Sequence, residues 1–594
     1  MLPKETNLYI PVNEVFPEIK NDFETFKSLL GCLSRTDTLF RCARLNGIIS
    51  NASGVNDINR QQYALDRFLN AKEIRAVNDF AQRNGGAQRV KVFFRGQLLE
   101  LVRWGSLYCS DHPGYGRTED SEIRRKFAQA ALIASEIWEK RVFGERLSDN
   151  GDITIRRQKA LGSFRKSLEA TDVTPDLYRT LGRGWVLFND YFPIYYRTVE
   201  YELLSLTGLS IEQYYCCLCA ITSNFMNPNN IEPGIFDSNT LGTSTPYAEV
   251  IQKYLALESQ TIDELRDTLW GDGIKNIKAF EDVPPYDYRP LRERPILRSS
   301  EGRGIILDPI FFSERASVGP LFLLSKNKPE NKANDIFNAF GKSFENYASD
   351  ILRRMFPEIP GLFNRLSCNL KIFETNQSDN MLEIDACLNE VTEVVLFEMK
   401  AVWLREEEIL TEDHARYLQH LREKYGVAEG TCRDRKIKGV GQLAKQIKVM
   451  ASKGWLEKNE KFSKIQLIYP VLVVHDTRLS EFLHGNFLAS EFKALLAPDD
   501  EPRSGELKKG QLRIAPLIVM TIEELEDLET SVEYFSLRDL IADYSQSCPD
   551  RLQTLHNFIY SSKYYSQHMC HNQRLVDKFL VLLQRCKEEV FPTG

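Results

Sequence analysis

The stretch MLEIDACLNEVTEVVLFEMKAVWL, residues 381–404, predicts a β-hairpin whose strands carry charges in unusual places. In a strand, every second side chain lies on the same face. Residues 381–388 and 394–403 are mostly apolar, and a turn near residues 389–392 would join them. The charged residues that interrupt these two strands are Glu383, Asp385, Glu398 and Lys400.

Charges inside a sheet cost several kcal/mol each unless something compensates them, and a divalent cation is one such compensation. Carboxylates from adjacent strands form the oxygen cage that Mg²⁺ prefers, with positions left for water and phosphate. Lys400 lies about 7 Å from Glu398 along one strand face, at about 3.3 Å per residue. Its amine could orient or deprotonate a water, or neutralise charge on phosphorus, which suits metal-assisted phosphodiester hydrolysis. The purely structural alternative is a buried ion pair that joins the two strands, in which Lys400 is the cation and Glu398 or Asp385 is the anion.

This arrangement resembles the PD-(D/E)xK, or restriction-endonuclease-like, nuclease superfamily. The family pattern is a helix with a glutamate, a strand with an aspartate, a strand with E-x-K, and a helix that often carries a glutamine. Short motifs of this kind gain weight from their order and their context in the chain. The matching residues are Glu345 in GKSFENYASDIL, Asp385, Glu398, Lys400, and Gln442 in GVGQLAKQI.

The resemblance implies a role for each of these residues. Lys400 would act on the attacking water, and Gln442 would steady the lysine, the water or the scissile phosphate. Two positions depart from the family pattern: Ile384 stands where proline is common, and Gln446 stands where many relatives with the glutamine helix have tyrosine. The side chains that would hold Mg²⁺, for which Mn²⁺ is expected to substitute, are Glu345, Asp385 and Glu398.

The sequence around the hairpin predicts an α/β nuclease core over residues 330–535, a mixed sheet flanked by helices. An amphipathic helix is expected at 335–356, because its apolar residues recur at helical spacing. The remaining expected elements are strands at 370–374, 465–474 and 514–520 and helices at 441–450 and 521–528.

Outside this core the chain is expected to be mainly helical. Residues 1–279 are predicted to be a large α-helical recognition or regulatory region, and residues 536–594 a helical C-terminal extension. Between them, residues 280–329 are predicted to connect the two through short strands at 304–312 and 320–324, after a proline-rich charged stretch.

Composition limits the class of protein. Of 594 residues, 43% are hydrophobic and 27% charged, which excludes a disordered chain, a collagen and a small disulfide scaffold. No apolar run approaches the roughly 20 residues of a membrane helix. The N-terminus lacks a secretory signal pattern, and the 12 cysteines have no framework spacing, so reduced thiols and a cytoplasmic location are expected.

The charge changes sign near the candidate site. Residues 416–464 contain 13 Lys and Arg against 5 Asp and Glu, although the whole chain has a formal net charge of −7. Such a local basic strip is enough to attract phosphate. A solvated helix face is the simpler alternative. The residues predicted to bind nucleic acid are Arg433, Arg435, Lys436, Lys438, Lys445 and Lys448.

The expected function is therefore an Mg²⁺-dependent endonuclease that hydrolyses DNA. A role in bacterial anti-phage defence is implied by fold-level analogy alone. RNA is a further substrate to consider, and a homodimer or higher oligomer and a regulatory protein partner are additional expectations. The alternative from another class is a non-catalytic nucleic-acid-binding or assembly protein that retains a nuclease-like fold.

Overall fold

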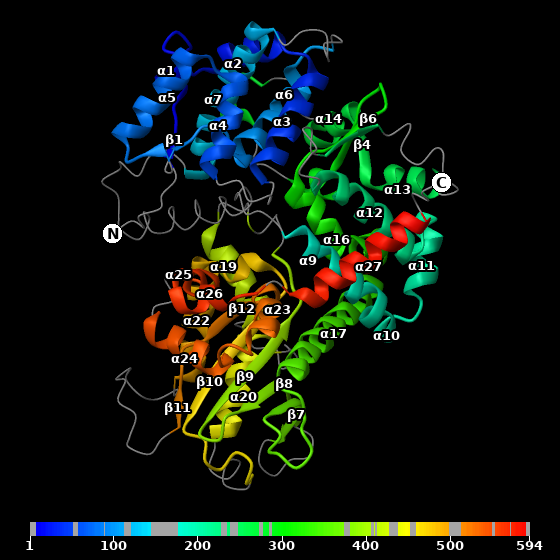
Figure 1. The fold of residues 1–594 in the computed structure, drawn as a ribbon, viewed down its shortest axis with the longest axis vertical. Coiled ribbons are helices and arrows are strands. Elements are labelled where there is room, and N and C mark those ends of the chain that lie inside the picture. Colours follow the sequence, from blue (N-terminus) through cyan, green and yellow to red (C-terminus); the bar gives the residue numbers. More distant parts are fainter. Residues whose placement is uncertain are drawn as a thin grey trace. The chain divides into compact units, whose positions relative to one another are not determined.

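The chain forms two compact units in the computed structural model, shown in Figure 1. The first unit comprises residues 1–186, 198–324 and 577–594, and the second comprises residues 187–197 and 325–576. The main part of the second unit begins at Ser325. The domain ranges predicted from the sequence remain predictions. The structure describes residues 8–50, 57–87, 90–111, 120–143, 176–226, 234–237, 248–271, 277–283, 288–373, 381–404, 409, 413–426, 437–451, 459–497, 512–548, 553–570 and 572–589.

The first unit is mainly helical, with two small sheets. Strand β1 (Leu8–Tyr9) pairs with β2 (Val90–Lys91), and a four-stranded sheet has the order β3-β6-β5-β4. These four strands are β3 (Ile235–Asp237), β4 (Ser259–Thr261), β5 (Ile296–Arg298) and β6 (Arg303–Ile306). The helices are α1 (Val12–Val15), α2 (Phe23–Gly31), α3 (Arg35–Ser50), α4 (Asp57–Phe68), α5 (Ala71–Arg83), α6 (Arg95–Tyr108), α7 (Ser121–Phe143), α9 (Leu177–Val186), α11 (Val199–Thr207), α12 (Ile211–Met226), α13 (Ala248–Glu258), α14 (Ile262–Trp270), α15 (Arg289–Glu293) and α16 (Pro309–Ser325).

One predicted strand of the connecting region is wrong. Residues 320–324 lie inside helix α16, and the predicted strand at 304–312 is limited to β6, which ends at Ile306. Most residues of α16 are buried, on nearly every side of the helix. A fully buried helix has no amphipathic period, and a short apolar run of it cannot be distinguished from a buried strand.

The second unit is built on a mixed six-stranded sheet. Its order is β11-β10-β9-β8-β7, with β12 also paired to β10. β7–β8 and β8–β9 are antiparallel, whereas β9–β10 and β10–β12 are parallel. The strands are β7 (Leu366–Phe373), β8 (Met381–Asn389), β9 (Glu393–Lys400), β10 (Leu467–Val474), β11 (Arg513–Ile514) and β12 (Ile518–Thr521).

Helices of the second unit cover both faces of this sheet. Ser349 of α17 contacts Met399, whereas Leu396 shares a core with Ile447 of α20. Because alternate strand residues face opposite ways, α17 and α20 lie on opposite faces. The helices are α10 (Phe192–Tyr195), α17 (Glu330–Met355), α19 (His414–Tyr425), α20 (Val440–Ala451), α22 (Phe482–Leu496), α23 (Ile522–Ser531), α24 (Leu537–Ser547), α25 (Leu555–Ser561), α26 (Lys563–His568) and α27 (Gln573–Glu589), whose larger part belongs to the first unit.

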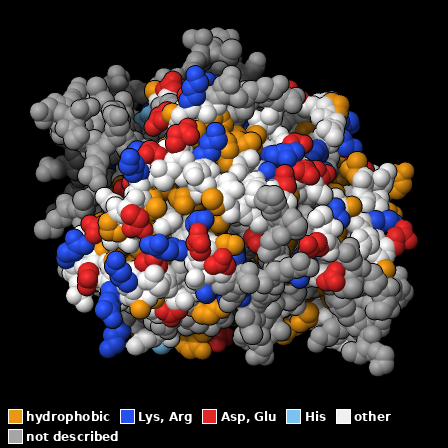
Figure 2. Space-filling model, turned by 90° about the horizontal axis from the view of Figure 1, so that it is seen from above, with side chains coloured by type: hydrophobic (Ala, Val, Ile, Leu, Met, Phe, Trp, Pro, Cys, Tyr) orange, Lys and Arg blue, Asp and Glu red, His pale blue; other side chains and the backbone are white. Residues whose placement is uncertain are grey.

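The coarse prediction of a helical body with a mixed, helix-flanked sheet is thus confirmed, as is the helical C-terminal segment. Among the described residues, none of the helices combines the length and apolarity required to cross a bilayer. Acidic and basic side chains are interspersed on the face drawn in Figure 2.

Candidate functional site

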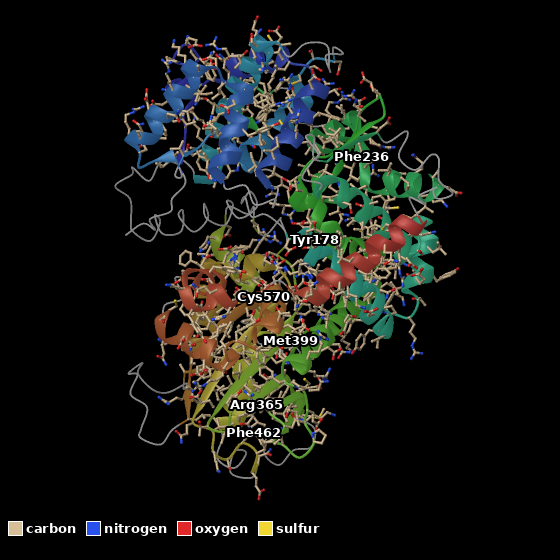
Figure 3. All side chains as sticks on the ribbon, viewed as in Figure 1. Tyr178, Phe236, Arg365, Met399, Phe462 and Cys570 are labelled. Carbon is tan, nitrogen blue, oxygen red and sulfur yellow. The ribbon has the colours of Figure 1, made fainter. Side chains whose placement is uncertain are left out.

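The hairpin of β8 and β9 positions two acidic residues beside each other. Its register pairs Ala386 with Phe397, so one step further along the strands Asp385 is opposite Glu398. Asp385 Oδ2 accepts a hydrogen bond from the backbone N–H of Met399 at 2.7 Å. The Asp385 carboxylate therefore bridges the two strands just beyond the Ala386–Phe397 pair. Figure 3 labels Met399, which lies in this sheet.

Glu398 is completely buried. Its Oε1 lies 2.7 Å from Lys400 Nζ, in an ion pair. Its Oε2 accepts a hydrogen bond from Gln446 Nε2 of α20 at 3.2 Å. Gln446 Nε2 also donates to the backbone carbonyl of Glu383 at 2.7 Å. Gln446 thus links β8 to the carboxylate on β9.

A third carboxylate comes from α17. The buried stripe of this helix, which includes Phe344 and Tyr347, packs it against the unit's core and leaves Glu345 at the edge of that stripe. Glu345 Oε1 lies 3.6 Å from Lys400 Nζ. The Lys400 side chain is 17% exposed and that of Glu345 is 38% exposed, so Glu345 lies at the opening of the cluster.

The backbone at Lys400 is fixed by the neighbouring strand. The N–H of His475, which follows β10, donates to the Lys400 carbonyl at 3.2 Å. The His475 ring lies 5.1 Å from that of Trp403 and 5.6 Å from that of Phe344. These aromatic contacts hold the carboxyl ends of β9 and β10 against α17.

The cluster contains three carboxyl groups and one ammonium, and burial is the main cause of the shifts in the pKa values of the carboxyl groups. Burial, and then the proximity of Asp385, raises the pKa of Glu345 to about 7 and that of Glu398 to about 8. Burial also raises the pKa of Asp385. Burial alone would lower the pKa of Lys400, but Glu398 and the other two carboxylates outweigh it and raise that pKa. Lys400 therefore remains a cation at neutral pH.

The carboxylates of this cluster can be compared with the ligands that a divalent cation requires. Within the described part of the chain, no three or more His, Cys, Asp or Glu side chains are close enough to form a ready-made metal site. The Lys400 ammonium lies between two of the carboxylates instead. The chemistry of the donors nonetheless fits Mg²⁺, because they are hard carboxylate oxygens. Burial raises the pKa values of Glu345 and Glu398, and a cation bound beside them would favour their ionised forms.

The structure brings four of the five predicted core residues together and adds one. Glu345, Asp385, Glu398 and Lys400 converge, but the glutamine that contacts Glu398 is Gln446. Gln442 lies one helical turn earlier on α20 and is half-buried, and its predicted role remains a prediction. The fully buried Gln446 Oε1 has no hydrogen-bond partner among the described residues. The QxxxQ spacing contained a signal for Gln446, since residues four apart share a helix face.

The predicted basic strip is described only in part. Lys438 and Lys448 are exposed and Lys445 is half-buried. Lys445 and Lys448 lie on α20 within one turn of Gln446, so positive charge is close to the cluster in sequence and along the helix. The other predicted nucleic-acid-binding residues, which lie outside the described part of the chain, are Arg433, Arg435 and Lys436.

Comparison with known proteins does not extend this description. No protein-family model matches the chain, and no curated protein or solved structure matches it either.

Proposed function

We propose that this chain is a metal-dependent nuclease of the PD-(D/E)xK type that hydrolyses phosphodiester bonds of DNA with Mg²⁺. The observation that carries the proposal is the convergence of three carboxylates and one ammonium from a helix and two adjacent strands. The order α17, β8, β9, α20 follows the order of elements in the family pattern. Perturbed pKa values in a partly open cluster also favour a functional site over a structural one.

The acidic residues would hold the cation and control the proton. Asp385 and Glu398 are fixed by hydrogen bonds to the backbone and to Gln446, so their oxygens are preorganised. A bound Mg²⁺ would supply Lewis-acid activation of a phosphate oxygen and would lower the pKa of water. Glu345 is the most open of the three, and a pKa close to neutrality suits it to accept the proton of the attacking water.

Lys400 would stabilise charge. Its raised pKa keeps the ammonium protonated, which favours neutralising the phosphate over acting as a base. In the hydrolysis, the water oxygen bonds to phosphorus as the bond from phosphorus to the leaving sugar oxygen breaks. One water proton passes to Glu345, and the leaving sugar oxygen is protonated by a second water molecule, whose hydroxide is neutralised by the proton that Glu345 later releases. The products are a phosphate monoester and a sugar hydroxyl.

One observation favours the alternative of a non-catalytic nucleic-acid-binding or assembly protein. The 2.7 Å ion pair between Lys400 and Glu398 already supplies one positive charge to the cluster. Under this alternative the chain would bind nucleic acid without cutting it, and salt would weaken that binding steeply. The defence role, the oligomeric state and a regulatory partner remain proposals that depend on the nuclease itself.

The test is cleavage of supercoiled plasmid by the purified chain with Mg²⁺, with Mn²⁺ or with EDTA, and a parallel RNA substrate. We expect nicking with either metal, none in EDTA, and a loss of roughly 10³-fold in rate for Lys400→Ala and Asp385→Ala. Lys563→Ala, which removes an exposed lysine of α26, is the matched control and should cleave normally. Nicking that survives in EDTA, or in either site variant, would reject the assignment.

A further inference from the structure

A polar hollow lies between α10 and α17, the helix that also carries Glu345. Its volume is about 290 Å³, and its lining combines a cation, an aromatic ring, an amide and a carboxylate. This volume is at the lower end of that of small-molecule sites and matches a fragment such as a nucleobase. The lining residues are Tyr195, Asp335, Asn338, Ala339 and Lys342.

The hollow is held in shape by the packing of α10 on α17. Figure 1 shows these two helices next to each other within the second unit. The Phe192 ring lies 6.1 Å from that of Phe340, and Asn346 Nδ2 donates to the Tyr195 hydroxyl at 2.6 Å. The Tyr195 ring is therefore anchored at one end while 38% of the residue remains exposed.

The polar side chains of the hollow are available to a ligand. Asp335, Asn338 and Lys342 are exposed, and in the ranges that the structure describes none of the three has a hydrogen bond or an ion pair to another residue. They follow one another at spacings of three and four residues, so they line one face of α17. Continuing by three residues on this face leads to Glu345, the open member of the carboxylate cluster.

We infer that this hollow binds an unpaired nucleobase next to the scissile phosphate, so that the substrate is single-stranded or locally unpaired DNA. The inference rests on the proposed function, because the neighbouring cluster is what places the phosphate. Tyr195 offers a ring on which a base stacks, as single-stranded nucleic acids do on aromatic side chains. The edge of a base that normally pairs is reachable only when the base is unpaired.

The lining also predicts which bases bind. The Asp335 carboxylate repels phosphate, so the backbone lies toward Lys342 and the base toward Asp335. A carboxylate accepts hydrogen bonds from an exocyclic amino group, as in cytosine, and thymine has none. Asn338 can donate to a ring nitrogen or carbonyl through its amide. Oligo-dC is therefore expected to bind more tightly than oligo-dT.

The experiment measures binding of fluorescent dC and dT oligonucleotides to the full chain by anisotropy in EDTA, where cleavage does not contribute. We expect Tyr195→Ala to weaken binding about tenfold through lost stacking. Lys342→Ala should reduce the slope of log affinity against log salt by about 0.7, the effect of one single-strand phosphate contact. Asp335→Ala should remove a preference for dC over dT of about fivefold.

Two control variants test whether these changes in binding are specific to the hollow. Tyr201→Ala and Lys332→Ala remove exposed side chains that do not line the hollow, and they should leave affinity unchanged. The mononucleotide dCMP should bind at least tenfold more weakly than the oligonucleotide, and equal affinity would overturn the inference. The inference would also be overturned if the variants of the hollow bound as tightly as the wild type, or if the chain preferred duplex DNA. If the wild type cleaves DNA and Tyr195→Ala binds the oligonucleotides as tightly as the wild type, this inference fails and the proposed nuclease function stands. If binding depends on the base but the chain does not cleave, only the proposed nuclease function fails.

Discussion

Two buried clusters of charged residues, one in each unit, differ in how their charges are paired. In the first unit, Arg315 of α16 contacts both oxygens of Glu258 at 2.7 and 2.8 Å, and the Tyr214 hydroxyl donates to the same carboxylate at 2.9 Å. In the second unit, the single ammonium of Lys400 faces three carboxylates. In the first cluster each charge has an opposite partner, whereas the second has more carboxyl groups than cations.

The difference shows how a structural ion pair can be told from a candidate site. A bidentate guanidinium–carboxylate pair uses the oxygens of Glu258 fully, and both residues are buried, so nothing is left for a ligand. The Lys400 cluster opens to solvent through Glu345 and keeps the pKa values of its acids above the ordinary range. It would gain from a cation or a substrate, whereas the Arg315 pair would gain nothing.

The largest expected effect comes from removing each cation in turn. Arg315→Met leaves Glu258 buried without its partner, and we expect a loss of about 3–5 kcal/mol in the free energy of unfolding. Lys400→Met leaves acids that already tend to take up protons, so its loss at pH 7 should be less than half as large. Urea-induced unfolding followed by circular dichroism measures both. Equal losses would mean that the Lys400 cluster is a structural ion pair as well.

A second prediction separates the two glutamines of α20. Gln446→Leu removes the hydrogen bond to Glu398 Oε2, and loss of such a supporting contact typically costs 10- to 100-fold in metal affinity or activity. Because that hydrogen bond lowers the pKa of Glu398, the midpoint of the pH–rate profile should also move to higher pH. A purely structural role would not move it. Gln442→Leu, on the same helix, is the control.

If Gln442→Leu shows the larger loss, the sequence assignment is correct and the contact at Gln446 is secondary. The titration to follow is cleavage rate against Mg²⁺ concentration, which reports the affinity for the cation separately from the maximal rate.

Much of the second unit could be predicted from sequence because its pattern is local. Alternation in residues 381–404 gives the hairpin, and the charges inside it identify Asp385, Glu398 and Lys400 as neighbours. The helix that ends at Met355 was equally visible from its apolar stripe. In each case a single period, two for strands and 3.6 for helices, decides which side is buried.

The rest depends on contacts between distant segments. Gln442 and Gln446 share a helix face, and only the axial position of α20 over the sheet decides which one reaches Glu398. Nothing in the sequence near Tyr195 shows that residues 187–197 pack with α17 and complete the hollow. The misassigned strand at 320–324 has the same origin, since burial by other helices removes the amphipathic period.

The smallest expected effect is the change in stability when an amide replaces the Glu345 carboxyl group. Its pKa is raised in the folded chain from 4.5 to about 7, by burial and then by Asp385. The folded state therefore holds this proton more tightly than the unfolded state. The stabilisation is complete below about pH 4.5 and is lost as pH rises through about 7. Above that pH, Glu345→Gln should be more stable than the wild type.

Because the Glu345 side chain is 38% exposed, solvent screens part of this repulsion, and we expect a gain of order 1 kcal/mol at pH 9 and none at pH 4. Cleavage should move in the opposite direction, since the variant loses a carboxylate that holds the cation and accepts the proton. Glu358→Gln, which removes an exposed carboxylate after α17, should change neither quantity. A stability gain at high pH together with lost cleavage would mean that Glu345 lowers the stability of the fold and is needed for activity. No such gain is expected at the Arg315 pair, because its two charges are already paired.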